Sequence, residues 1–183
     1  MDLVKGSLAY VAKQENMGLA ESFLNAEIIV LLDDSGSMEA NDAPGGISRR
    51  EAARNELIRL QHAHPGKIAL VCFASHPVFS PSGTIVKCGG TTDMAEALRF
   101  VKVADDCGIK IVLVTDGAPD SEQETLDIAK TFKSRIDCIY IGPETGYGLS
   151  FLNKLMKVTG GKQFQSREPG MLGDGVETLL LTE

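Results

Sequence analysis

A continuous apolar run, Ile28 to Leu32, passes without a spacer into the polar residues Asp33, Ser35 and Ser37. Such a run, rich in β-branched residues, is typical of a central strand that is buried on both faces of a parallel sheet. Open α/β sheets bind their ligands just beyond the carboxyl ends of such strands. The sequence therefore predicts three oxygen-bearing side chains on one tight turn at a ligand-binding edge, and Gly36 allows that turn to close.

Apolar runs alternate with amphipathic segments along the rest of the chain. The runs at 67–74, 110–116, 136–141 and 162–165 predict further strands. Between positions 76 and 87, two short strand candidates flank a Pro/Gly turn, which is typical of an edge strand that runs in the opposite direction. We therefore expect one antiparallel strand at an edge of the sheet.

Helices are predicted between the strands. Ser48, Asp93 and Ser121 each precede a glutamate by three positions, which is the spacing of a capping box at a helix N-terminus. Further helices are predicted at 149–158 and 171–181. Strands that alternate with helices indicate βαβ units and a mainly parallel sheet that is covered by helices on both faces.

The charge and hydropathy of the chain exclude several classes of partner. The 183 residues carry a formal net charge of −7 and no basic face is evident, so no nucleic-acid partner is expected. Neither a signal-peptide segment nor an apolar run of about 20 residues is present, so we expect no membrane association and a cytoplasmic location. Arginines and glutamates mix in the helix that follows Ser48, which predicts a solvated face. The arginines concerned are Arg49, Arg50, Arg54 and Arg59.

We expect the cysteines, the histidines and several other aspartates to have structural rather than chemical roles. Cys72 and Cys138 lie within strand-like runs, where small buried thiols without a disulfide are expected. The histidines show no zinc-site spacing with the carboxylates. Asp105, Asp106 and Asp120 are predicted to be solvated residues at helix ends.

Oxygen side chains lie at three separate strand-to-helix junctions. Asp33, Ser35 and Ser37 follow the first strand, Thr91 opens the turn before a helix, and Asp116 ends a later strand. If those two strands are neighbours at the switch point of the sheet, the five side chains converge. Two carboxylates and three hydroxyls suit a hard divalent cation, Mg²⁺ first, with Mn²⁺ or Ca²⁺ as alternatives. The one carboxylate and two hydroxyls of the first turn compensate the charge of the ion only in part, so the bound ion would still accept an oxygen from outside, and some of the five groups could act through bridging waters.

The elements D-D-S-G-S-M, G-G-T-T-D-M and V-T-D-G, in this order and separation, resemble the von Willebrand factor type A (VWA) domain. The metal-ion-dependent adhesion site (MIDAS) of that family has the pattern D-x-S-x-S…T…D. The resemblance matches this pattern residue by residue and assigns the metal to Asp33, Ser35, Ser37, Thr91 and Asp116. The adjacent Asp34 fills a position that is often apolar in the family and is not assigned as a ligand.

The resemblance also implies an architecture. It predicts a Rossmann-like, doubly wound three-layer α/β sandwich with a mainly parallel central sheet, one antiparallel edge strand and helices on both faces. It divides the chain into an N-terminal helical extension, residues 1–26, and a VWA domain, residues 27–183. Loops at 39–46 and 143–148 are expected to form the rim of the site.

The function that the resemblance implies is protein binding. VWA domains mostly bind proteins, and an Asp or Glu of the partner completes the coordination of the metal. Intracellular bacterial and archaeal members often work with AAA+ ATPases or in assembly complexes. We therefore expect a metal-dependent binding module rather than an enzyme.

Two other function classes stay open. A Mg²⁺-dependent phosphatase of the haloacid dehalogenase type also has an aspartate-ended strand, but it needs D-x-D where this chain has Asp33 and Ser35. The adjacent Asp34 would point to the opposite side of the strand, and no G-x-x-x-x-G-K-[ST] phosphate loop is present. The other alternative is a metal-free interaction scaffold, against which the full set of ligand residues argues.

Overall fold

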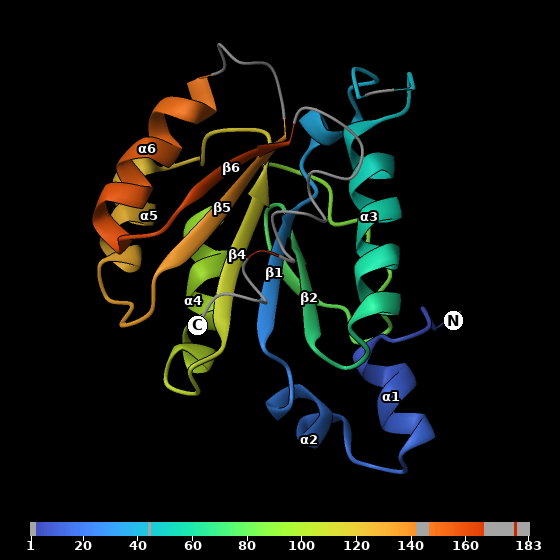
Figure 1. The fold of residues 1–183 in the computed structure, drawn as a ribbon. Helices are drawn as coiled ribbons and strands as arrows, with labels where there is room; N and C mark the ends of the chain where they lie inside the picture. The colour runs from blue at the N-terminus through green and yellow to red at the C-terminus, as the bar shows by residue number, and fades with distance from the viewer. Residues whose placement is uncertain (1–2, 44, 142–146, 167–177, 179–183) are drawn as a thin grey trace.

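A mainly parallel sheet lies at the centre of the chain, between helices. The structure, a computed structural model, describes residues 3–43, 45–141, 147–166 and 178 (Figure 1). Within these residues the strand order is β3-β2-β1-β4-β5-β6, and only β3 runs antiparallel to its neighbour. The strands are β1 (Ile28–Asp33), β2 (Ile68–Phe73), β3 (Pro77–Phe79), β4 (Lys110–Thr115), β5 (Ile136–Ile141) and β6 (Gln163–Ser166).

Helices cover both faces of the sheet, with α3 on one side and α4, α5 and α6 on the other (Figure 1). The helical elements are α1 (Leu8–Gln14), α2 (Leu19–Leu24), the 3₁₀ helix η1 (Gly36–Glu39), α3 (Arg49–Ala63), α4 (Met94–Asp105), α5 (Glu122–Ala129) and α6 (Tyr147–Thr159). The predicted three-layer α/β sandwich with one antiparallel edge strand is therefore confirmed. The predicted helix 171–181, apart from residue 178, and most of the predicted rim loop 143–148 lie outside the described residues.

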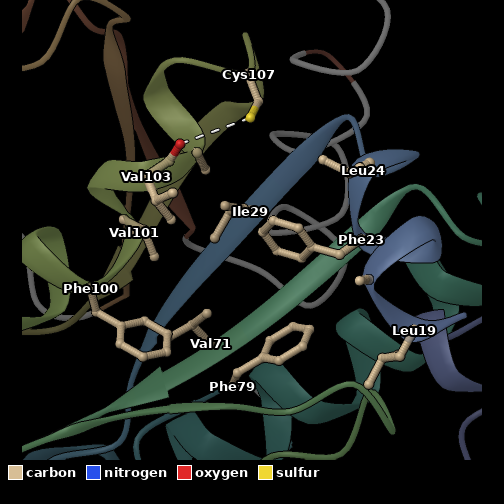
Figure 2. Close-up of a pocket in the computed structure, with 12 residues that line it drawn as sticks. Leu19, Phe23, Leu24, Ile29, Val71, Phe79, Phe100, Val101, Val103 and Cys107 are labelled. Atoms are coloured by element: carbon tan, nitrogen blue, oxygen red, sulfur yellow. Dashed lines mark hydrogen bonds between the residues drawn. The ribbon is translucent and has the colours of Figure 1, made fainter.

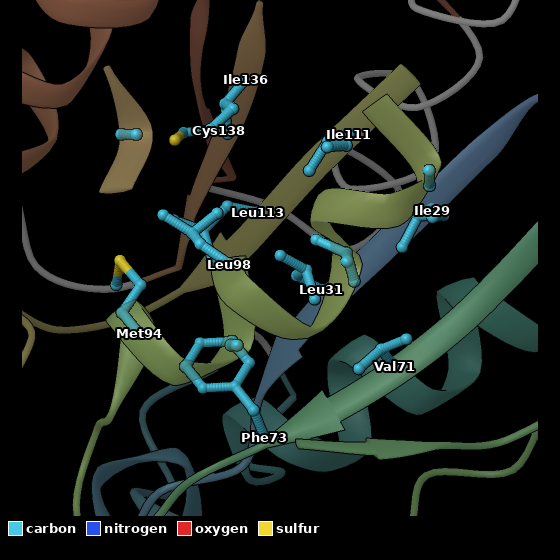
Figure 3. Packing of buried hydrophobic residues seen from close by; sticks show 14 of the residues in the cluster. Ile29, Leu31, Val71, Phe73, Met94, Leu98, Ile111, Leu113, Ile136 and Cys138 are labelled. Atoms are coloured by element: carbon cyan, nitrogen blue, oxygen red, sulfur yellow. The ribbon is translucent and has the colours of Figure 1, made fainter. Parts of the chain in front are cut away.

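The side chains of β1 alternate between two apolar cores. Ile29 and Leu31 pack with α4 and α6, as Figure 3 shows for the neighbouring Leu98 of α4. Ile28 and Val30 face the opposite way, toward α3. Full burial of one such side chain contributes about 1.5–3 kcal/mol, so the two cores fix β1 as the centre of the fold. The polar turn that follows β1 is thereby held at a defined place.

The helices begin where the capping residues predicted them. The side chains of Ser48, Asp93 and Ser121 each accept a hydrogen bond from the backbone N–H three residues later. Buried thiols are also confirmed, because Cys72 and Cys138 are buried and all four cysteines are free.

Two structural expectations are wrong. Segment 76–87 forms one short strand rather than two. After that strand, the Val86 N–H donates to the Cys72 sulfur and the Ser80 hydroxyl donates to the Thr84 carbonyl, so these groups do not pair in a second strand ladder. Asp105 is buried rather than solvated, and it accepts hydrogen bonds from the backbone of the α5–β5 connection. Burial raises the pKa of this carboxyl, but the Lys102 ammonium and those backbone N–H groups together bring it below its ordinary value.

The N-terminal residues pack against the rest of the domain. Backbone hydrogen bonds join Val4 N–H to the Ser82 carbonyl and Ala9 N–H to the Pro81 carbonyl, each at 2.9 Å. Leu8 is part of the same apolar core as Ile29. The backbone of this segment comes so close to α3 at Gly6 that a Cβ built there would lie 1.9 Å from the Gln61 carbonyl oxygen.

We expect the Gly6→Ala variant to lower the free energy of unfolding by about 1–3 kcal/mol, because Gly6 has a φ of +83° and no room for a Cβ. Urea unfolding measures this loss. The control is Gly18→Ala, at a position with a φ of −68° and nothing within 4 Å of a new Cβ, which should change stability by less than about 1 kcal/mol. Equal losses in both variants would contradict the packing of this segment.

Candidate metal centre

The first and fourth strands of the chain end side by side. Strands β1 and β4 are parallel neighbours with Leu32 opposite Val114, so the residues that follow them meet at one edge of the sheet. This edge carries the carboxyl ends of strands whose connections diverge to opposite sides, which is where open α/β sheets bind ligands. Asp33 ends β1, and Asp116 follows β4 directly.

Asp33 lies at the bottom of the site and is completely buried. Its Oδ1 accepts a hydrogen bond from the Ser35 N–H at 2.9 Å, and its Oδ2 accepts one from the Thr115 hydroxyl at 2.6 Å. Burial raises the pKa of the Asp33 carboxyl, the two hydrogen bonds lower it, and the nearby charge of Asp116 raises it further, with a net increase. The folded chain therefore disfavours the charge on Asp33 unless a cation compensates it.

Two serines connect Asp33 to Asp116. Ser35 is the N-cap residue directly before the short helix η1, and its Oγ lies 3.1 Å from the Ser37 Oγ. Ser37, which is exposed, donates a hydrogen bond from its hydroxyl to the Asp116 Oδ1 at 2.7 Å. Four of the five predicted residues thus form one hydrogen-bonded group, which we call the oxygen cluster: Asp33, Ser35, Ser37 and Asp116.

Thr91 stands apart from the oxygen cluster in the contacts that the structure describes. Its N–H donates to the Ser75 Oγ at 3.1 Å, and its own Oγ1 lies 3.3 Å from the same atom. The next residue, Thr92, donates its N–H to Asp120 Oδ1, which attaches this loop to the segment after β4. Thr91 is exposed, so its hydroxyl is open to solvent rather than bonded to the four cluster residues.

Arg49 and Arg50 are not on a solvated helix face, and that prediction is wrong for both. Arg49 donates from Nη1 to the Asp116 Oδ2 at 2.6 Å, and from Nε and Nη2 to both carboxylate oxygens of Asp42, at 2.8 and 2.5 Å. The side chain of Arg49 is only 10% exposed. The contacts of Arg49 were not predicted from the sequence, and the one signal that could have indicated them is that a cation in the first turn of a helix opposes the helix dipole and therefore favours nearby carboxylates.

Asp34 has a different environment from Asp33. Its Oδ2 accepts a hydrogen bond from the Cys88 N–H at 2.7 Å, and its Oδ1 lies 2.5 Å from the Nε of Arg50. Arg50 also pairs with Glu39 at 2.5 Å. Both carboxylate oxygens of Asp34 therefore contact Cys88 or Arg50 and not the oxygen cluster, and Asp34 is not assigned as a ligand.

The donor set of the oxygen cluster fits a hard divalent cation. Two carboxylates and two hydroxyls offer only oxygen atoms, which Mg²⁺, Mn²⁺ and Ca²⁺ prefer. Asp33 and Asp116 are both buried, and the nearby charge of Asp116 disfavours the charged form of Asp33, an effect that a bound cation would relieve. Ser37 is exposed, so the cluster is open to solvent on one side. Nowhere among the described residues do three or more His, Cys, Asp or Glu side chains form a group that could hold a metal, and the oxygen cluster itself combines two carboxylates with two hydroxyls.

A pocket of about 660 Å³ lies toward the opposite end of the sheet, between α2, α4 and strands β1 to β3 (Figure 2). Apolar side chains and Cys107 line it, and three phenylalanines, Phe23, Phe79 and Phe100, contribute much of its wall. It offers no oxygen ligand for a hard cation.

No helix among the described residues is long and apolar enough to span a membrane.

Comparison with known proteins places the fold. No protein-family model matches the chain, and no curated protein matches it in sequence. Its fold is similar to a von Willebrand factor type A structure from Catenulispora acidiphila, with a TM-score of 0.64, 15% identity, and coverage of 85% of this chain but only 42% of that one. It is also similar to the hypothetical protein BatB of Bacteroides thetaiotaomicron, with a TM-score of 0.60, 17% identity, and coverage of 85% and 97% of the two chains.

A third similar structure is the manganese-loaded TRAP protein of Plasmodium vivax. Its TM-score is 0.57 at 18% identity, and the match covers 85% of this chain and 72% of that one. These identities are low, so the likeness concerns the fold alone. The chain has a VWA-like α/β fold.

Proposed function

We propose that the chain is a metal-ion-dependent protein-binding module that docks an acidic side chain of a partner onto a divalent cation. One observation carries the proposal: Asp33, Ser35, Ser37 and Asp116 meet in one hydrogen-bonded group at the carboxyl ends of β1 and β4. The sequence order D-x-S-x-S…T…D, on a VWA-like fold, resembles the MIDAS pattern. The manganese in one structure of similar fold adds support.

Each residue has a distinct role in this proposal. Asp33 and Asp116 supply the negative charge that holds the ion, and the Ser35 and Ser37 hydroxyls supply neutral oxygen atoms. Thr91 is the proposed fifth ligand, directly or through water, because its hydroxyl is open to solvent on a neighbouring loop. If only one of the two carboxylates contacts the ion directly and the other acts through a bridging water, the ion keeps a net positive charge in its inner coordination shell and can accept a further carboxylate.

The partner in this proposal is an acidic protein segment, and an AAA+ ATPase or an assembly complex in the cytoplasm is the class we propose. The described rim of the site is mixed in charge: Asp42 and Glu39 are half-exposed, and each is paired with an arginine of α3. An approaching Asp or Glu would therefore be attracted by the ion itself rather than by a broadly basic surface.

We propose that the chain is not an enzyme. A phosphatase of the haloacid dehalogenase type needs a second, free carboxylate near the first. The nearest candidate, Asp34, is paired with Arg50 and accepts the Cys88 N–H. Hydrolysis of p-nitrophenyl phosphate in Mg²⁺ above the rate of the Asp33→Ala variant would favour that alternative instead.

The proposed function is tested by selecting binders from a displayed library of random peptides against the immobilised chain in Mg²⁺. We expect the enriched peptides to share an Asp or Glu, and to lose at least about tenfold in affinity when that residue becomes Asn or Gln, because a charged metal ligand is lost. Excess chelator and the Asp33→Ala variant should each abolish binding. The matched control is Asp106→Ala, an exposed acid that pairs with Lys133 at the C-terminal end of α4, and this variant should bind normally. Peptides that bind equally well in chelator would contradict the proposal.

A further inference from the structure

Asp116 uses both of its carboxylate oxygens in the structure. Its Oδ1 accepts the Ser37 hydroxyl, and its Oδ2 accepts the Arg49 guanidinium at 2.6 Å. The Asp116 side chain is completely buried, so this pair is shielded from water. Ser37 is itself a proposed ligand, whereas Arg49 lies outside the proposed ligand set.

Arg49 is held in place from the other side as well. Both oxygens of Asp42 accept hydrogen bonds from the remaining edge of the guanidinium, and the backbone N–H of Arg49 donates to the Ala40 carbonyl at 3.1 Å. Arginine stays charged at any pH at which the chain is folded. A permanent positive charge therefore stands against one carboxylate of the oxygen cluster.

We propose that Arg49 is a tethered cation that occupies Asp116 in the metal-free chain, and that a divalent ion binds to the oxygen cluster in competition with it. This inference rests on the proposed function. A cation that takes an Asp116 oxygen must displace the guanidinium or bind beside a like charge, and either event weakens metal binding. Arg49 thus lowers the affinity for metal while it stabilises the metal-free site, where Asp33 and Asp116 would otherwise repel each other.

Neutralising Arg49 tests the competition. We expect Arg49→Gln to bind Mg²⁺ and Mn²⁺ at least about tenfold more tightly than the wild type in calorimetric titration, because the opposing charge is gone. Its unfolding temperature in chelator should fall, and the rise on adding Mg²⁺ should exceed that of the wild type. The control is Arg54→Gln, an exposed site on the same helix, which removes the same charge away from the cluster and should leave the affinity within about twofold.

The wild-type chain gives a second, independent readout. In a titration with diamagnetic Mg²⁺, the guanidinium Nε–H signal of Arg49 should shift in step with saturation. The signal of Arg50, which pairs with Asp34 and Glu39, should stay constant. This measurement holds even if Arg49→Gln does not fold.

The outcomes separate the two proposals. Two results would overturn the competition alone, provided that the wild type binds Mg²⁺. One is an unchanged or weaker affinity in folded Arg49→Gln, and the other is an Arg49 signal that does not move at saturation. Absence of Mg²⁺ binding in both the wild type and Arg49→Gln overturns the proposed function as well. Tighter binding in Arg49→Gln with normal binding in Arg54→Gln supports both.

Discussion

Replacing Asp33 by alanine is expected to abolish saturable Mg²⁺ binding and to cost less than about 1 kcal/mol of metal-free stability. Asp33 is the more deeply buried of the two carboxylates of the oxygen cluster, and it accepts the Ser35 N–H that begins the serine turn. Its pKa is raised, chiefly by burial, so its charged form is less stable in the folded chain than in the unfolded chain. At neutral pH the loss of that charge offsets the loss of its hydrogen bonds.

The sign of this effect follows from linkage. A carboxyl whose folded pKa is raised contributes most to stability at low pH and loses that contribution as the pH rises through its unfolded and folded pKa values. Thr115, which donates to Asp33, also has the Gly117 carbonyl within 3.4 Å and keeps a partner in the variant. Calorimetric titration and urea unfolding in chelator measure the two quantities. A variant that still binds Mg²⁺, or that unfolds without metal, would contradict the assignment.

Replacing the next residue, Asp34, by alanine should have the opposite result. We expect a loss of about 3 kcal/mol in the free energy of unfolding, because the variant removes one partner of a largely buried ion pair. The Cys88 N–H loses its acceptor, and Arg50 keeps only Glu39 and a long contact to the residue-34 carbonyl. Mg²⁺ affinity should stay within about fivefold of the wild type, because Asp34 does not belong to the oxygen cluster.

Asp34→Asn is the matched control, since its side-chain oxygen still accepts the Cys88 N–H. It should lose less stability than Asp34→Ala in the same urea titration. If folded Asp34→Ala loses metal binding altogether, the division between the two neighbouring aspartates is incorrect. Together, Asp33→Ala and Asp34→Ala separate the metal centre from the structural ion pair at one turn of the chain.

The strands and the cluster could be predicted because they depend on local patterns. The run Ile28 to Leu32 is apolar at every position, as a strand buried on both faces requires. Asp33 and Asp116 each stand where such a strand ends, so their convergence needed only that β1 and β4 be neighbours.

Side chains whose partners lie far along the sequence could not be predicted in the same way. Arg49 meets Asp116 across 67 positions, and Asp34 meets the Cys88 N–H across 54. Mixed charges on α3 are typical of solvated helices, and nothing local distinguishes Arg49 from Arg54 except its place in the first turn. Asp105 is similar, because the backbone groups that bury it come from beyond α5.

The central claim is that the oxygen cluster binds a divalent cation, and calorimetric titration of the metal-free wild-type chain with Mg²⁺ and Mn²⁺ tests it most directly. The account predicts saturable binding at one site per chain, with a matching rise in unfolding temperature, and loss of both in Asp33→Ala but not in Asp34→Ala. Absence of binding heat together with an unfolding temperature that is identical in Mg²⁺, in Mn²⁺ and in chelator would contradict it.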